Sequence, residues 1–264
     1  GMTTADSVAG KLAGNSADFD GGTTNYINFG SPAILDDLSP MTVCAWHEFD
    51  TRPSSYGVLL TKDQAGGYNG FELWEGSSNF GISNRYGGTY RNNAQSANVW
   101  KHYCGTWNGG SGSADTKLYW NGAGGGSTFG ASGSSDAAND LSMGSVTDGS
   151  RPIDGRIDEV RISSTTRSVA WIAAEYTNQA TTTDFYTTAM NVSLATEWNA
   201  TDWTLYDTIT IDATKVDATL TDFPVYVDLA DLSSQFWSTT PTGSGTVGTD
   251  IRVTTNDGSP VELA

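Results

Sequence analysis

The sequence is poor in basic residues, cysteine and histidine, and each shortage excludes a class of protein. Its 264 residues include 13 Lys and Arg against 30 Asp and Glu, a formal net charge of −17. Such a surface repels phosphate backbones and anionic headgroups, so nucleic acids and membrane surfaces are not expected partners. Two cysteines are too few for a disulfide scaffold or a cysteine-ligated zinc site. The two histidines form no His-Glu-x-x-His metalloprotease motif.

Long apolar runs are also missing. No stretch of about 18 apolar residues occurs, so membrane insertion is not expected. The first residues, GMTTADSVAGKLAG, lack the basic and apolar regions of a signal peptide. The chain instead has 31 glycines, many Ser and Thr residues and 11% aromatic side chains. This composition is typical of short strands joined by turns.

Short apolar or alternating segments, bounded by turn-forming residues, predict an antiparallel β architecture. They are residues 24–30, 41–49, 56–62, 69–76, 79–84, 99–108, 116–122 and 154–163. The segment YWNGAG (119–124) predicts a hairpin with a type I′ turn at Asn-Gly. One helix is predicted over 168–179, with Ser168 as its N-cap. So many short strands favour a two-sheet sandwich or jelly roll.

The last third of the chain has a second β pattern. Residues 180–202 are Thr-rich and predict a linker with one extended segment, and strands are predicted at 205–212, 222–229 and 250–258. Three strands seldom form an independent domain. We therefore expect this C-terminal part to be an incomplete domain.

One predicted strand, GRIDEVRIS (155–163), carries two adjacent carboxylates. In an extended strand Asp158 shares a face with Val160 and Ile162. Glu159 and Arg161 lie on the other face, where they can pair in solvent. We expect Asp158 to point toward the apolar side, where an unpaired carboxylate is costly. It should accept hydrogen bonds, pair with an Arg or bind a metal ion.

Several segments together resemble the laminin-G-like modules of bacterial and archaeal surface proteins, within the concanavalin A-like lectin/glucanase superfamily. They are FDGGTTNYINFG (19–30), MTVCAW (41–46), VWKHYCGTW (99–107), LYWNG (118–122) and GRIDEVRIS followed by a short helix. The resemblance covers residues 8–190. It implies an all-β, two-sheet antiparallel jelly-roll sandwich with one short helix near its end. It also implies that an early strand normally precedes ADSVAGKLAG.

Residues 203–264 resemble the first half of an uncharacterised β-rich domain found beside laminin-G-like modules in large microbial surface proteins. The pieces TITID, LTDFPVYVDL and DIRVTTNDG carry this match. We therefore predict two parts, a jelly roll at 8–190 and a partial β domain at 203–264. Both are expected to belong to a longer modular chain that is extracellular or at the cell surface, with neighbouring modules as partners.

The family resemblance also implies a structural calcium ion. Its position corresponds to Asp20 in the FDG turn and Asp158 in the IDE segment, with oxygens near Gly22 and Asn25 as further ligands. Calcium takes six to eight oxygens from carboxylates and carbonyls, so the residue types fit. In the alternative, Asp20 caps a turn and Asp158 accepts backbone N–H bonds.

The two cysteines lie in strands that are often neighbours in laminin-G-like modules. Strand alternation predicts that Val43 and Ala45 face the core, whereas Cys44 and Trp46 share the opposite face. A cross-strand Cys44–Cys104 disulfide is compatible with an exported protein. Two buried free thiols are the alternative.

Aromatic and polar residues gather around NRYGGTYRNN (84–93), which we interpret as a Gly-rich loop. The candidate ligand-binding residues are Trp74, Tyr86, Tyr90 and Arg91. Aromatic faces with amide and guanidinium donors suit sugar rings, which combine apolar faces with hydroxyl edges. In the alternative, the aromatic side chains only cover the sheet.

Catalysis is not expected. The related glucanases carry their carboxylates in a Glu-x-Asp-x-Glu strand, and this pattern does not occur in the chain. Glu72 and Glu75 have odd spacing, which places them on opposite faces of a strand. The sequence therefore predicts noncatalytic recognition of a glycan or cell-surface polysaccharide, as in cell adhesion. A structural spacer of a surface array or virus particle is the alternative, and a glycan-active enzyme is the third hypothesis.

Overall fold

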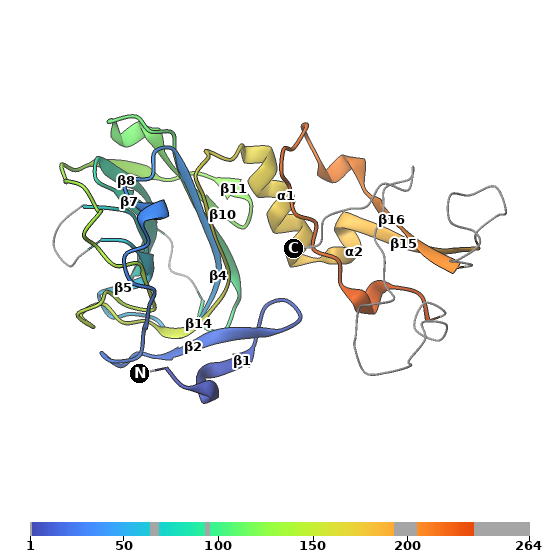
Figure 1. The fold of residues 1–264 in the computed structure, drawn as a ribbon, viewed down its shortest axis with the longest axis horizontal. Coiled ribbons are helices and arrows are strands. Elements are labelled where there is room, and N and C mark those ends of the chain that lie inside the picture. Colours follow the sequence, from blue (N-terminus) through green and yellow to red (C-terminus); the bar gives the residue numbers. More distant parts are fainter. Residues whose placement is uncertain (1, 64–68, 93–95, 193–204, 235–264) are drawn as a thin grey trace. The chain divides into compact units, whose positions relative to one another are not determined.

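The computed structural model describes residues 2–63, 69–92, 96–192 and 205–234. The chain divides into two compact units, Gly1–Tyr176 and Thr177–Ala264. Within the described residues, the first unit contains two antiparallel sheets of seven strands each, stacked as a sandwich (Figure 1). The predicted all-β jelly-roll class is therefore confirmed. No described helix has the length and hydrophobicity needed to cross a membrane.

Sheet A is the layer that contains the first and the last strand of the sandwich in chain order. In spatial order its described strands are β1 (Ser7–Ala9), β2 (Asn15–Asp20), β14 (Asp154–Ser163), β4 (Met41–Thr51), β9 (Lys101–Trp107), β10 (Thr116–Trp120) and β11 (Ala123–Gly124). The predicted Asn-Gly hairpin joins β10 to β11, with φ of 48° at Asn121 and 76° at Gly122. Positive φ at both residues is what a type I′ turn requires.

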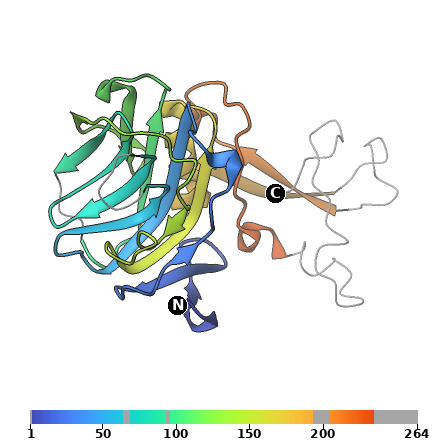
Figure 2. The same cartoon turned by 60° about the vertical axis from the view of Figure 1, so that its left-hand side comes forward.

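Sheet B is the opposite layer (Figure 2). Its described strands, in spatial order, are β12 (Ser127–Gly130), β8 (Gly87–Asn92), β7 (Asn79–Asn84), β6 (Glu72–Gly76), β5 (Tyr56–Thr61), β13 (Ser142–Met143) and β3 (Ile27–Asn28). Residues 84–93 therefore contain a strand, β8, and not the loop that the sequence predicted. Gly87 begins this strand with φ of 133°, a conformation that residues other than glycine rarely adopt.

The apolar core lies between the inner faces of the two sheets. Val43 and Ala45 of β4 belong to it and are fully buried, as predicted. The intervening Cys44 and Trp46 face away from the core, where Trp46 stacks on Tyr176 with ring centroids 5.8 Å apart. The prediction for the two faces of this strand is confirmed. The outer face of sheet A is therefore not a solvent face.

A β-bulge in β14 overturns the predicted orientation of Asp158. Residues Ile157 and Asp158 pair with His47 and Trp46, but the register then shifts, so Arg161 pairs with Cys44. Glu159 occupies the extra position with φ of 51°. The bulge reverses the alternation, because one strand gains a residue that its partner lacks. Asp158 thus lies on the outer face with Trp46, and not on the inner face with Ile162.

The residues of helix α1 (Val169–Ala180) that belong to the first unit, up to Tyr176, lie against the outer face of sheet A (Figure 1). The predicted N-cap is confirmed, because the Ser168 hydroxyl accepts a hydrogen bond from the Trp171 amide at 3.2 Å. Ile172 is fully buried and Glu175 is 2% exposed. The helix therefore presents an acidic side chain to the sheet as well as apolar ones.

The second unit contains, among its described residues, helix α2 (Thr182–Phe185) and a two-stranded ribbon of β15 (Tyr186–Val192) and β16 (Leu205–Ile211). The prediction of a strand at 222–229 is wrong, because these residues form no strand. Their backbone is held instead by a side chain, since Asn178 Nδ2 donates to the Tyr226 carbonyl at 2.8 Å and Asn178 Oδ1 accepts from the Tyr226 amide at 2.6 Å. The strand predicted at 250–258 lies outside the described residues.

Five short 3₁₀ helices complete the described elements. They are η1 (Thr4–Asp6), η2 (Ala33–Leu35), η3 (Ser113–Asp115), η4 (Ala213–Lys215) and η5 (Leu229–Asp231). In the second unit η5 is tied to the ribbon, because Asp231 Oδ2 accepts from the hydroxyls of Thr182 and Tyr186, each at 2.8 Å. Burial and the Asp231 carboxylate raise the pKa of Tyr186 to about 12.

Candidate functional site

The structure does not bring the four predicted calcium residues together. Asp20 ends β2 opposite Asp154 of β14, whereas Asp158 lies four residues further along β14. That separation is about 13 Å at the usual rise of a strand. Asp20 Oδ1 accepts from the Gly22 amide at 2.8 Å, which is the turn-capping alternative. Asn25 is buried, and its Oδ1 has no partner among the described residues.

Asp158 acts as an acceptor of backbone N–H bonds. Its Oδ2 accepts from the amides of Lys11 at 2.8 Å and Leu12 at 3.4 Å, and its Oδ1 accepts from the Glu159 amide at 2.8 Å. Both carboxylate oxygens are thus occupied by the segment between β1 and β2 and by the bulge. Calcium binding by this chain stays a prediction, but Asp20 and Asp158 do not form one coordination site.

The predicted ligand-binding residues divide between two faces of sheet B. Trp74 pairs with Gly81, and Gly81 pairs with Tyr90, so Trp74 and Tyr90 lie in one row on the outer face. Arg91 pairs with Phe80, a core residue, and its guanidinium lies 5.1 Å from the Trp120 ring between the sheets. Arg91 is therefore excluded from this row.

Tyr86 also lies outside the row. It packs against the core cluster, and its ring centroid is 5.8 Å from that of Trp107 in sheet A. Two of the four candidates, Trp74 and Tyr90, therefore share a surface. Sequence reasoning could not separate them from Tyr86 and Arg91, because it treated residues 84–93 as a loop without alternation.

Two aromatic residues that sequence reasoning missed complete this surface. Tyr56 stacks on Trp74 with ring centroids 4.8 Å apart, and Phe129 lies 6.2 Å from Tyr90. We call Tyr56, Trp74, Tyr90 and Phe129 the aromatic platform. Tyr56, Tyr90 and Phe129 are partly exposed, whereas Trp74 is 6% exposed.

Glycine allows the platform rings to lie against the sheet. A Cβ at Gly81 would lie 2.6 Å from Trp74 Cζ2, and a Cβ at Gly88 would lie 2.9 Å from Phe129 Cε1. Such contacts are too short for real atoms, so a side chain at either position would displace the ring above it. The two glycines therefore define where the rings of the platform sit.

An ion pair borders the platform. Glu72 accepts from Arg151 Nη1 at 2.9 Å, and the Arg151 guanidinium lies 4.9 Å from the centroid of the Tyr56 ring. Burial raises the pKa of Glu72 to about 7, although Arg151 opposes the shift. Glu72 thus changes its charge near neutral pH at the edge of an aromatic surface.

Glu75 lies on the opposite face of the same strand, as its spacing from Glu72 predicted. It pairs with Phe80 in the core, and its Oε2 accepts from the Tyr103 hydroxyl at 3.0 Å. Burial raises the pKa of Glu75 to about 8 against the effects of Tyr103 and Arg52. Glu72 and Glu75 therefore do not face a common cleft, which a pair of catalytic carboxylates would need.

The outer face of sheet A carries a second group of polar side chains. Cys44 and Cys104 are directly opposite each other in β4 and β9 and form a disulfide, with Cα atoms 4.1 Å apart. His102 Nε2 lies 3.4 Å from Glu175 Oε2, and Arg161 Nη1 donates to Glu175 Oε1 at 2.6 Å. Burial would raise the pKa of Glu175, but His102 and Arg161 lower it overall.

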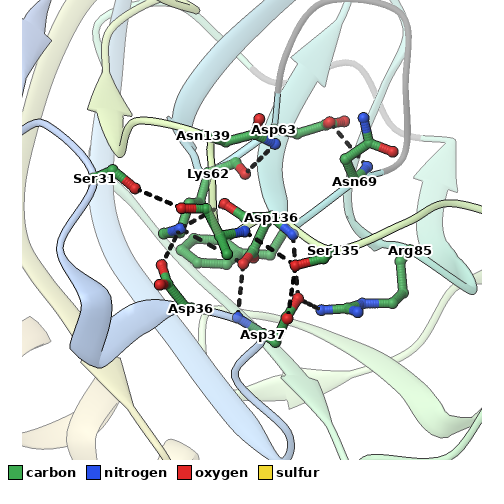
Figure 3. Close-up of polar contacts among 12 residues, drawn as sticks. Ser31, Asp36, Asp37, Lys62, Asp63, Asn69, Arg85, Ser135, Asp136 and Asn139 are labelled. Atoms are coloured by element: carbon green, nitrogen blue, oxygen red, sulfur yellow. Dashed lines mark hydrogen bonds and ion pairs between the residues drawn. The ribbon is translucent and has the colours of Figure 1, made fainter.

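A third polar group lies at one end of the sandwich and is centred on Lys62 (Figure 3). The Lys62 ammonium is fully buried and donates to Asp36 Oδ1 and to the Asp136 carbonyl, both at 2.7 Å. Asp37 exchanges hydrogen bonds with Asp136 and pairs with Arg85. These contacts join four segments that are distant in sequence. Since the ammonium already supplies the positive charge among the carboxylates, we assign this group a structural role.

Two antiparallel sheets around one apolar core, with an aromatic surface on an outer face, define a jelly-roll sandwich module. The family comparison gives this class a name. Residues 20–173, more than half of the chain, match the family model Laminin_G_3, described as the concanavalin A-like lectin/glucanases superfamily. The chain belongs to this family. No curated protein matches the chain.

Solved structures with a similar fold share little sequence with the chain. The binding domain of botulinum neurotoxin serotype G has a TM-score of 0.50 and 10% identity, over 67% of this chain and 46% of the toxin domain. The CBM40 of the Ruminococcus gnavus IT-sialidase, bound to α2,3-sialyllactose, has a TM-score of 0.44 and 13% identity, over 58% of this chain and 92% of the module. A SAP-like pentraxin from Limulus polyphemus has a TM-score of 0.43 and 13% identity, over 76% and 96%. Likeness at this level describes the fold alone.

Proposed function

We propose that this protein is a noncatalytic recognition module that binds carbohydrate on the aromatic platform of sheet B. The proposal rests on the platform itself and agrees with membership of a lectin-like superfamily. Sugar rings have apolar C–H faces and hydroxyl edges, so a site for them needs flat aromatic surface beside a few placed polar groups. The platform and its bordering ion pair offer both.

The observation that carries the proposal is the indole N–H of Trp74. This nitrogen is buried, and no acceptor among the described residues lies within hydrogen-bond distance of it. A buried donor without a partner costs about 1–3 kcal/mol. Because this nitrogen is closed to solvent, a hydroxyl oxygen of a bound sugar would satisfy the donor only when a neighbouring side chain moves aside, while the C–H face of the sugar packs on the neighbouring rings. Glu72 and Arg151 would then accept from and donate to further hydroxyls.

The Cys44–Cys104 disulfide supports the proposal that the module works outside the cell. Structural disulfides persist in oxidising compartments and are rare where thiols are kept reduced. A cell-surface module of a longer chain would meet polysaccharide there. Adhesion to such a polysaccharide is the role that we propose for the complete protein.

Binding to an array of glycans and polysaccharides, with and without calcium, tests the function. We expect Tyr90→Ala to weaken binding of the best array ligand at least about tenfold, because it removes one ring of the platform. Arg91→Ala is the matched control, since Arg91 is the next residue of β8 but points between the sheets. The affinity of the Arg91→Ala variant for the same glycan should stay within about twofold of the wild-type value.

Trp74→Phe tests the indole donor separately from the ring. This variant keeps an aromatic side chain and loses the N–H, so affinity should fall even though the platform remains. Failure of the wild-type chain to bind any glycan on the array would contradict the proposal and favour a structural spacer. Equal losses in Tyr90→Ala and Arg91→Ala would also contradict it, because they would show a general effect on folding.

A further inference from the structure

We propose that Cys44, Cys104, His102 and Glu175 bind one zinc ion when the Cys44–Cys104 disulfide is reduced. The four side chains come from β4, β9 and α1, and each is at most 2% exposed. Their ligand atoms all lie within 4.8 Å of one another. Two cysteines alone do not complete a zinc site, which is why the sequence argued against one. The fold supplies the other two ligands.

The spacing of these atoms matches a tetrahedral metal site. Zn–S bonds of about 2.3 Å and Zn–N or Zn–O bonds of about 2.0 Å place the ligand atoms roughly 3.3–3.8 Å apart. His102 Nε2 is 3.4 Å from Glu175 Oε2, and Cys104 Sγ is 3.8 Å from His102 Nε2 and 3.7 Å from Glu175 Oε2. Three edges of the tetrahedron therefore exist in the disulfide form. The other three edges involve Cys44 Sγ, which lies within 4.8 Å of the other ligand atoms and must move away from Cys104 Sγ once the disulfide is broken.

The charges around the cluster also suit a divalent cation. Two thiolates and the Glu175 carboxylate carry three negative charges, whereas zinc and Arg161 carry three positive charges. Arg161 contacts Glu175 through Oε1, which leaves Oε2 directed at His102 and Cys104. Arg161 also pairs with the partly exposed Glu159, so the balance applies to the buried groups around the metal and not to every nearby charge. Compensation of the buried charges avoids the high cost of an unpaired buried charge.

The reduction, the binding of zinc and the reoxidation each balance with the reagents named here. A phosphine and one water reduce the disulfide to two thiols, and the phosphine leaves as its oxide. Zinc then binds both sulfur atoms as thiolates and releases two protons to solvent. Reoxidation to the disulfide by a two-electron thiol oxidant expels the ion. The same four residues would thus hold either a disulfide or a metal.

Cobalt(II) serves as a spectroscopic probe for this site. The full chain is reduced with phosphine in denaturant and refolded without oxygen in the presence of Co²⁺ or Zn²⁺. We expect one metal ion per reduced chain, with thiolate-to-cobalt charge-transfer bands and the intense visible bands of tetrahedral cobalt. The oxidised chain, taken through the same denaturation and refolding without phosphine, should bind none at the same site. Bound zinc should also protect both cysteines from alkylation.

His102→Ala and Glu175→Gln test the two ligands that are not cysteine. Each should weaken metal binding more than about tenfold and shift the cobalt spectrum, because even changes outside the ligand shell cost 10–100-fold. Glu159→Gln is the matched control, since Glu159 also contacts Arg161 but is not a ligand. If either ligand variant fails to fold, the comparison of reduced and oxidised wild type decides. A reduced chain with native circular dichroism and no cobalt–thiolate bands would overturn the proposal.

Discussion

The outer faces of the two sheets carry similar side chains in opposite settings. On sheet A, Glu175 faces both His102 and Arg161 beneath helix α1, and its pKa is lowered. On sheet B, Glu72 has Arg151 beside it, and burial raises its pKa to about 7. Both carboxylates are equally buried, so burial alone does not decide their charge.

The difference shows how each face is used. On sheet A, Glu175 pairs with His102 and Arg161, and a covalent bond and a helix cover the surface, although the buried Nδ1 of His102 has no partner among the described residues. On sheet B the carboxylate of Glu72, whose pKa is about 7, lies on the same face of β6 as the Trp74 indole N–H, which has no acceptor among the described residues, at the edge of rings that are partly exposed. While the disulfide is intact, the arrangement on sheet A favours stability, whereas the arrangement on sheet B favours a ligand.

The largest effect is expected from removing the bond that closes the face of sheet A. Replacing Cys44 and Cys104 together with Ser should lower the free energy of unfolding by about 4 kcal/mol, since the bond links residues 60 positions apart in the sequence. Urea denaturation, followed by tryptophan fluorescence, measures the change. Tyr90→Ala on the platform of sheet B should cost far less. A loss below about 1 kcal/mol in the double variant would show that packing of α1, and not the disulfide, holds this face.

The next effect concerns pH and separates Glu72 from Glu175. The folded-state pKa of Glu72, about 7, exceeds the ordinary value of 4.5. The folded state therefore binds more protons between these values, and the stability contribution of Glu72 is present below pH 4.5 and lost as pH rises through 7. Between pH 5 and pH 8 the free energy of unfolding of the wild type should therefore fall by up to about 3 kcal/mol more than that of Glu72→Gln.

Glu175 gives the opposite dependence and serves as the comparison. Because its folded-state pKa is lowered, its contribution is present above the ordinary pKa and lost as pH falls through the folded value. Glu175→Gln should therefore flatten the acidic side of the stability curve and leave the alkaline side unchanged. Urea midpoints measured from pH 3 to pH 8 give both curves. The comparison fails if Glu72→Gln and Glu175→Gln change the same side.

Strand alternation predicted the faces of residues correctly wherever a strand is regular. Val43, Ala45, Cys44 and Trp46 have the expected orientation because β4 pairs with β9 without a shift. Asp158 does not, because the left-handed residue of the bulge is Glu159, a side chain that does not signal such a conformation as glycine or asparagine would. The face on which Asp158 lies was therefore decided by the φ angle of one residue, and the residue type at that position does not predict this angle.

The sequence predicted which candidate residues share a face only when they belong to the same strand. Trp74 and Tyr90 meet because β6, β7 and β8 are neighbours in a particular register, and Tyr56 reaches them from another strand. Glu175 reaches His102 from a helix that follows β9 by more than 60 residues. No spacing rule links such positions, since their proximity follows from the pairing of whole strands and the packing of a helix on them.

The smallest effect in this series tests what Asp158 does on the face of sheet A. Asp158→Asn should lower the free energy of unfolding by about 2 kcal/mol, because an amide has one acceptor oxygen for three backbone donors and turns its NH₂ toward one of them. The loss should be equal in chelator and in calcium, as measured by urea midpoints. Glu159→Gln is the neighbouring control and should change stability by less than about 1 kcal/mol, because its pair with Arg161 is partly exposed. A destabilisation of Asp158→Asn that appears only in calcium would instead identify this carboxylate as a ligand. The segment that it holds, between β1 and β2, would then be fastened by an ion and not by hydrogen bonds alone.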